Sequence, residues 1–402
     1  MTTHLRILTA IGILFTGLEA KVAFAQTPTE VTEQAPAAAN TPKAEIPAAP
    51  KKRPEKIKPW KVNAILDMYY ATNFNKPAAV PQLAGSIPNG NNAYRAYDIY
   101  SRQMSLNLIE VSLSHKTQEV GFLIDLDFGN MADINAKTPP GAVVDEGSKH
   151  IGQAFITYTP ASLPKWSFDI GKFYTFVGLE VTKAKDNWNY SRSLLYNFGI
   201  PFWHTGIHAR YTPGSTWSAG FYVLNGWNTI YSVNSGQTFG LQLKFTPNDN
   251  LAIVYNGIVG PQQAGAANLI RSEHEVNVSY NFTSKLSVGL DFVDAGEQEG
   301  VSATQDSKWT AYSAALKYQI NDASYISPRF ESFKDVYGKI LDSTNIQTMQ
   351  SMTLTYGYKS VGGVETRLEY RQDSSDKKVF TKGDGTNTST QDTALVALLY
   401  AI

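Results

Sequence analysis

One pattern constrains the fold of this chain more than any other: apolar and polar residues alternate in two-residue steps, segment after segment, from Trp60 to Ile402. A strand places successive side chains on opposite faces, so this alternation is typical of strands between an apolar and a wet medium. The clearest case sets Val364, Thr366, Leu368 and Tyr370 against Glu365, Arg367, Glu369 and Arg371. Four charges in a row on one face must meet water or each other.

The alternation predicts an all-β chain of about sixteen strands (about 14–18), without helix signals. The strands are expected near residues 60–74, 100–114, 118–129, 150–159, 165–177, 206–212, 217–225, 237–246, 250–259, 272–282, 285–294, 308–319, 322–333, 346–357, 361–372 and 392–402.

The connections between these segments sort by length. After even-numbered strands they are tight and rich in turn formers, as at 212–216 and 321–323, whereas after odd-numbered strands they are mostly long and polar, as at 75–97 and 374–391. A secreted sandwich also has alternating strands but gives no reason for this sorting. Short turns on one rim and long loops on the other are typical of outer-membrane barrels. We therefore predict a transmembrane antiparallel β-barrel over residues 60–402.

The first residues have the features of an export signal. Arg6 supplies positive charge, residues 7–15 are apolar, and small residues precede a cleavage point after Ala25, which predicts a signal peptide over 1–25. Residues 26–59 are rich in Pro, Ala, Thr, Glu and Lys, a composition that predicts a disordered periplasmic linker. No segment reaches the roughly 20 apolar residues of a membrane helix. The protein is thus expected in the outer membrane of a Gram-negative cell.

Composition excludes several functional classes. The 35 basic and 35 acidic residues cancel and are scattered, so nothing favours nucleic acid as a partner. Charged residues make up 17% of the chain against roughly 25% in soluble domains, which suits a surface that faces outer-membrane lipid. There is no Cys and no GxSxG motif. We predict neither a cofactor nor a metal, because the four-residue spacing of His204 and His208 lies on an irregular loop running into a strand.

The long connection at residues 178–206 is aromatic, charged and irregular. By strand count it is the third long connection, and a loop that folds into a water-filled barrel narrows the pore. The candidates for this constriction are Lys183, Lys185, Asp186, Tyr190, Arg192 and His204. The alternative is a loop folded on itself at the cell surface.

The wet faces of the predicted strands carry charges of both signs. They are Asp125, Asp127, Lys172, Arg210, Lys244, Asp291, Arg329, Glu331, Glu365, Arg367, Glu369 and Arg371. A barrel of this size leaves an aqueous channel, and mixed charges in it predict weak ion selectivity. For residues 365–371, cross-strand pairing that stiffens the wall is an alternative.

Several motifs resemble one known family. They are GKF at 171–173, NWNYSRS at 187–193, GIPFWHTG at 199–206, NGWN at 225–228 and AYDIYSRQMSLNL at 96–108. These segments are similar to the β-barrel porin type 2, or OmpL-like, family of Gram-negative outer membranes. The resemblance implies an outer-membrane barrel that acts as a porin, without implying a particular solute.

Together the residues and the resemblance predict a weakly selective porin for small hydrophilic solutes. The alternatives are a plugged structural or adhesive barrel and an outer-membrane lipid hydrolase, for which Ser193 and His204 are the residues to vary. A homo-oligomer is an expectation by analogy with general porins. The last strand ends in Ile402 where such barrels commonly carry an aromatic residue, and the barrel assembly machinery is an expected partner.

Overall fold

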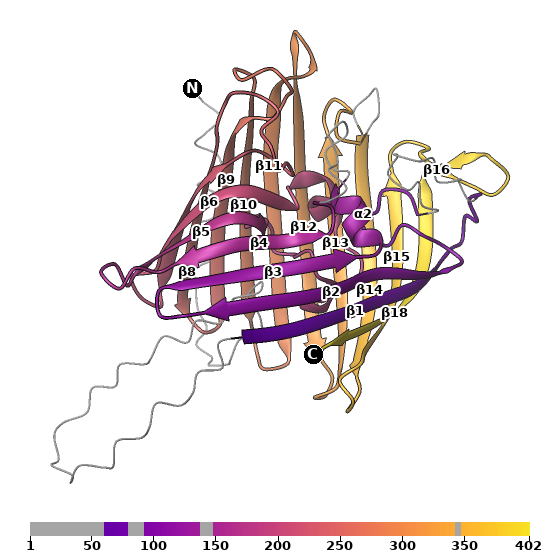
Figure 1. Cartoon of the computed structure of the whole chain (residues 1–402). Helices are drawn as coiled ribbons and strands as arrows, with labels where there is room; N and C mark the ends of the chain where they lie inside the picture. Colours follow the sequence, from indigo (N-terminus) through magenta and orange to yellow (C-terminus); the bar gives the residue numbers. More distant parts are fainter. Residues whose placement is uncertain (1–59, 79–91, 137–147, 342–346) are drawn as a thin grey trace.

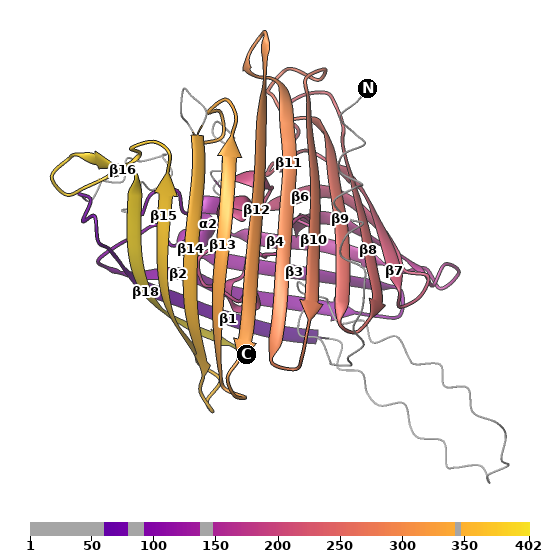
Figure 2. The ribbon, with the colours of Figure 1, turned by 180° about the vertical axis from the view of Figure 1, so that it is seen from behind.

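The computed structural model describes residues 60–78, 92–136, 148–341 and 347–402. The predicted signal peptide and linker lie outside the described residues. Sixteen antiparallel strands close into one barrel, in which each strand pairs with its neighbours in sequence and β1 pairs with β18 (Figures 1 and 2). The prediction of an all-β antiparallel barrel of about sixteen strands is confirmed.

The strands of the barrel are β1 (Trp60–Asn73), β2 (Met104–Lys116), β3 (Val120–Phe128), β4 (Ile151–Tyr158), β5 (Trp166–Tyr174), β6 (Trp203–Tyr211), β7 (Trp217–Leu224), β8 (Thr238–Asn248), β9 (Leu251–Pro261), β10 (Ile270–Asn281), β11 (Leu286–Ser302), β12 (Gln305–Gln319), β13 (Ser324–Asp335), β14 (Gln347–Lys359), β15 (Glu365–Ser375) and β18 (Thr390–Ala401). A two-stranded sheet of β16 (Phe380–Thr381) and β17 (Asn387–Thr388) lies in the β15–β18 connection.

The alternation divides the side chains as expected. On β15 the Leu368 side chain is 51% exposed on the outer face, whereas the neighbouring Arg367 is 1% exposed and points inward. Among the described residues, no helix has the length and hydrophobicity of a membrane span. The outer face is therefore apolar strand surface, and the inner face carries the charges.

The sequence shows no helix signal, but the described residues contain three short helical segments. A short helix, α2 (Asn130–Ala136), follows β3, and the β5–β6 connection contains a 3₁₀ turn, η1 (Ala184–Asp186), and a π turn, η2 (Leu195–Gly199). Each spans seven residues or fewer, which is too short to show helical periodicity in a sequence. The connection expected at 295–307 is also mostly strand, because β11 and β12 continue as a hairpin beyond the neighbouring strands (Figure 1).

The main apolar cluster lies inside the barrel, toward the long loops. Inward residues of the wall, such as Trp309, pack there with loop residues such as Tyr97, Met131 of α2, Tyr196 and Phe202. Loop side chains therefore occupy part of the lumen in this half of the barrel. Open space lies toward the rim of short turns, where β1 begins beside the end of β2.

Candidate functional site: an inward loop above a vestibule

The connection between β5 and β6, residues 175–202, enters the barrel; we call it the inward loop. It ends at Phe202 rather than at 206, because Trp203 already pairs with Tyr174 on β5. Its side chains and backbone bond to inward residues of β1, β2, β3 and β11 to β15. The loop therefore crosses the lumen instead of folding on itself at the surface.

Lys183 ties the loop to β2 and β3. Its Nζ lies 2.7 Å from Glu110 Oε1 and 3.0 Å from Asp125 Oδ2, and all three side chains are buried. Burial disfavours the ammonium, but the two carboxylates outweigh it and hold the pKa of Lys183 above its ordinary value. Lys183 is consequently a charged anchor inside the barrel.

Tyr190 ties the loop to β1 and β15. Its hydroxyl donates to Asp67 Oδ1 at 2.7 Å, and the side chain is buried. Burial, together with the Asp67 carboxylate, raises the pKa of the Tyr190 phenol well above its ordinary value, so the group stays a neutral donor. The backbone N–H groups of Tyr190 and Ser191 donate to the two oxygens of Glu369 at 2.7 and 3.1 Å.

Three arginines of the wall hold the loop by its carbonyl groups. Arg329 donates to Ser191 O at 2.7 Å, Arg367 to Ala184 O at 2.8 Å, and Arg371 to Arg192 O at 2.6 Å. Arg367 and Arg371 also pair along their own strand, with Glu365 at 2.7 Å and Asp373 at 2.8 Å. These guanidinium groups serve as anchors. Their ion pairs run along β15 and β13, to Glu180 of the loop, and across strands from Arg371 to Glu331 at 3.9 Å.

Acidic side chains of the wall bind the loop in the same way. Asp291 accepts from the Leu179 N–H at 2.9 Å, and Glu331 accepts from the Leu194 N–H. Asp127 accepts from the Tyr174 hydroxyl at 2.9 Å, at the foot of the loop. Most of the predicted lumen charges thus meet the loop instead of lining an open channel.

The remaining constriction candidates bond within or beside the loop. Arg192 donates to carbonyls of its own loop, including Tyr190 O at 2.5 Å, and Lys185 pairs with Asp186 at 2.8 Å. His204 belongs to β6, is fully buried, and bonds to Thr175 Oγ1 and Gly226 O. Ser193 Oγ accepts from the Tyr196 N–H.

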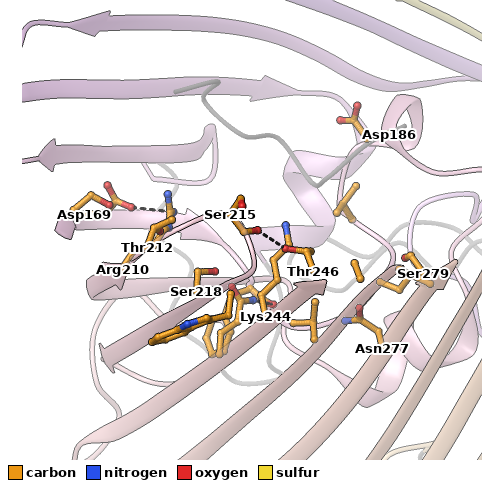
Figure 3. Close-up of a pocket in the computed structure, with 18 of the residues that line it drawn as sticks. Asp169, Asp186, Arg210, Thr212, Ser215, Ser218, Lys244, Thr246, Asn277 and Ser279 are labelled. Carbon is orange, nitrogen blue, oxygen red and sulfur yellow. Dashed lines mark hydrogen bonds and ion pairs between the residues drawn. The ribbon is translucent and has the colours of Figure 1, made fainter. Parts of the chain in front are cut away.

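Below the inward loop lies a cavity of about 1440 Å³, which we call the vestibule. Its walls come from β1 to β12 and the short turns. Its ceiling includes Phe176, Leu179 and Trp188 of the loop, together with Asp186, which Figure 3 labels. The charged lining consists of four basic side chains (Lys61, Lys116, Arg210, Lys244) and five acidic ones (Glu119, Asp169, Glu180, Asp186, Asp249). The vestibule is therefore nearly balanced in charge.

Lys172 of β5 and Arg210 of β6, both predicted to face the lumen, have different surroundings. Arg210 faces the vestibule, half exposed, with its guanidinium 3.7 Å from Asp169 (Figure 3). Lys172 instead donates to Ile151 O at 2.5 Å and lies over the Trp203 ring. Lys244 of β8 lines the vestibule.

Sequence reasoning missed several residues of the site. Glu110 and Asp169 stand on wet faces of predicted strands, so the alternation was a sufficient signal for their inward direction. Phe176 carried no signal, because an apolar residue near a strand end is unremarkable. Among the described residues, no group of three or more His, Asp or Glu side chains is arranged to hold a metal.

Residues 59–402 match the model of the family described as "Putative beta-barrel porin-2, OmpL-like". No sequence among curated proteins matches the chain. Solved structures share the fold at low identity. The outer membrane channel DcaP of Acinetobacter baumannii has a TM-score of 0.55 at 12% identity, with 85% of this chain and 97% of that chain covered.

Two further structures are similar to the same extent. The anion-selective porin from Comamonas acidovorans has a TM-score of 0.56 at 10% identity, covering 85% of this chain and 99% of that chain. The trimer form of OmpT from Vibrio cholerae has a TM-score of 0.50 at 11% identity, with the same shares covered. At these identities the structures show the fold alone.

Proposed function

Because the chain belongs to the OmpL-like porin-2 family of outer-membrane barrels, we propose that it passes small hydrophilic solutes with weak ion selectivity, and that the inward loop forms its constriction. The observation that carries this proposal is the position of the loop, which crosses the lumen on anchors from β1, β2, β3 and β11 to β15. A loop in that position narrows whatever path the barrel offers.

Weak selectivity is supported by the balance of charge in the vestibule. Rings of one sign repel ions of that sign, whereas four basic and five acidic side chains facing the same space produce little net preference. The inward arginines and carboxylates farther up are already paired with the loop. The family and the fold point to a channel rather than an enzyme.

A plugged barrel is the second candidate, and one observation favours it. Loop side chains fill the half of the lumen toward the long loops, including Tyr97, Met131 and Phe202. In that case the wall charges hold a permanent plug, and solutes do not cross.

Single-channel conductance in planar bilayers, with reversal potentials under a salt gradient, tests these proposals. The wild-type protein is compared with a variant lacking residues 190–198 of the inward loop. A matched control shortens the projecting β11–β12 hairpin at residues 300–304 (Figure 1). The porin proposal expects steps in the wild type with a reversal potential near zero, larger steps in the loop variant, and no change in the control.

Other outcomes decide between the candidates. If folded wild-type protein gives no conductance while the loop variant conducts, the plugged barrel is supported. If the loop variant conducts as the wild type does, the constriction lies elsewhere. We also propose a homo-oligomer, by analogy with the trimer form of OmpT, and chemical cross-linking in native membranes would reveal it.

A further inference from the structure

The inward loop is held unequally on its two sides. Toward β1, β2, β3 and β11 to β15 its contacts are buried ion pairs and charged hydrogen bonds, such as those of Lys183 and Glu180. Toward β7 and β8 the loop presents Phe176, which contacts the wall with an aromatic ring and a carbonyl oxygen. The two sides therefore differ in what must be broken to move the loop.

Phe176 fits a prepared place on the β7–β8 wall. Its ring stacks on Tyr222 of β7, with centroids 3.7 Å apart and an interplanar angle of 11°. Its edge lies over Gly240 of β8, where a Cβ atom would come within 2.7 Å of the ring. Gln242 of β8 donates to the Phe176 carbonyl at 3.0 Å. A glycine at 240 thus leaves the space that the ring fills.

The ring also separates two environments. Phe176 lines the ceiling of the vestibule. On the side away from the vestibule lies His204, with its ring centroid 5.5 Å from that of Phe176 and with no exposed surface. Phe176 therefore stands between the vestibule and buried residues nearer the long loops, such as His204 and Thr238.

Moving Phe176 away from the β7–β8 wall costs less free energy than freeing the loop from the opposite wall. Sliding one aromatic ring off another breaks no ion pair, whereas freeing Lys183 or Glu180 leaves charges buried without partners, which costs several times more. The vestibule wall near the ring is also polar without charge. Gln242 and Asn277 line it with amide groups whose nitrogens donate to Phe176 O, Asn256 and Glu275, so they present a neutral polar surface that favours neither charge sign.

We propose that Phe176 is the gate residue of the solute path, and that small uncharged polar solutes pass between the inward loop and strands β7 to β9. This inference rests on the proposed porin function and adds to it the side of the lumen where passage occurs. It assigns selection to one ring and an amide-lined wall, not to the charged anchors.

Conductance of single substitutions tests the gate. Phe176→Ala should raise single-channel conductance by about twofold or more, and Phe176→Trp should lower it, because the ring sets the width of the gap. The matched control is Phe221→Ala, which removes a lipid-facing ring from the same strand as Tyr222. It should conduct as the wild type does.

Thiol labelling gives a readout that does not need conduction, because the chain contains no cysteine. Thr238 lies on the same face of β8 as Gly240, one step toward the long loops, and is 1% exposed. A cysteine there should react with a charged thiol reagent at least about tenfold faster when Phe176→Ala is also present. Ser351→Cys, equally buried on β14, should stay slow in both backgrounds.

The outcomes separate this inference from the porin proposal. Conducting wild-type protein in which Phe176→Ala changes neither conductance nor labelling of residue 238 overturns the gate alone. Equal acceleration of labelling at 238 and 351 also overturns it, because the loop would then have loosened as a whole. If the wild type and Phe176→Ala are both silent in bilayers, the porin proposal falls and the gate falls with it, and faster labelling of residue 238 then shows only that the ring covers that position.

Discussion

Lys183→Met removes one charge from the inward loop and leaves the length of the side chain nearly unchanged. In the native protein the Lys183 ammonium lies between Glu110 and Asp125, at 2.7 and 3.0 Å. All three side chains are at most 6% exposed, so water does not replace the lost partner. The substitution therefore leaves two carboxylates facing each other inside the barrel.

Removing one partner of a buried ion pair typically costs about 3–5 kcal/mol. The barrel wall cannot move away from this cost, but the inward loop can. This free-energy cost should therefore shift the equilibrium from the loop bound to the barrel wall toward the released loop. At about 1.4 kcal/mol per factor of ten, the released population rises by about a hundred-fold to several thousand-fold.

Hydrogen exchange read by mass spectrometry measures this population directly. Amides of residues 179–199 should exchange faster in Lys183→Met by that factor, while amides of β11 in the same protein should not change. Adding Glu110→Gln and Asp125→Asn removes both stranded charges and should restore most of the protection. Unchanged exchange in Lys183→Met, or no recovery in the triple variant, would refute Lys183 as an ionic anchor.

Two further predictions concern pH and backbone geometry. The pKa of Lys183 is raised above its ordinary 10.5, so the stabilisation from its charge is complete below about pH 10.5 and is lost as the pH rises through the higher folded-state value. Conductance should therefore rise in strongly alkaline buffer, and this step should be absent from Lys183→Met. Gly171→Ala should prevent folding into a heat-modifiable barrel, because Gly171 has φ +143° and a Cβ there would lie 2.1 Å from Ala154 O, whereas Gly214→Ala meets nothing within 4 Å and should fold normally.

The barrel itself follows from local pattern, because each strand must satisfy lipid on one face and a polar interior on the other. Residues 364–371 show this in eight positions, with Leu368 outward and Arg367 inward. Whether a side chain faces lipid or the interior depends only on its place in the alternation with its immediate neighbours. The turn-forming residues indicate that short connections alternate with long ones. The two signals together predict the number of strands and which rim carries the long loops.

The contacts that position the inward loop do not follow from the local sequence pattern. Tyr190 meets Asp67 and Glu369, which are 123 and 179 residues away in the chain. Alternation places both carboxylates inside the barrel but does not say which loop group each will meet. Phe176 and Gly240 form a complementary pair of the same kind, which is visible only once the inward loop lies against β8.

The type of contact decides what holds the loop. Arg367, Arg371 and Glu369 bind backbone carbonyl and N–H groups of residues 184–192, which every residue type except proline supplies in full. Changing loop side chains such as Lys185 therefore leaves these bonds in place, whereas changing the wall charges removes them. On this side the position of the inward loop is thus encoded largely by the wall charges of β15 rather than by the loop's own side chains.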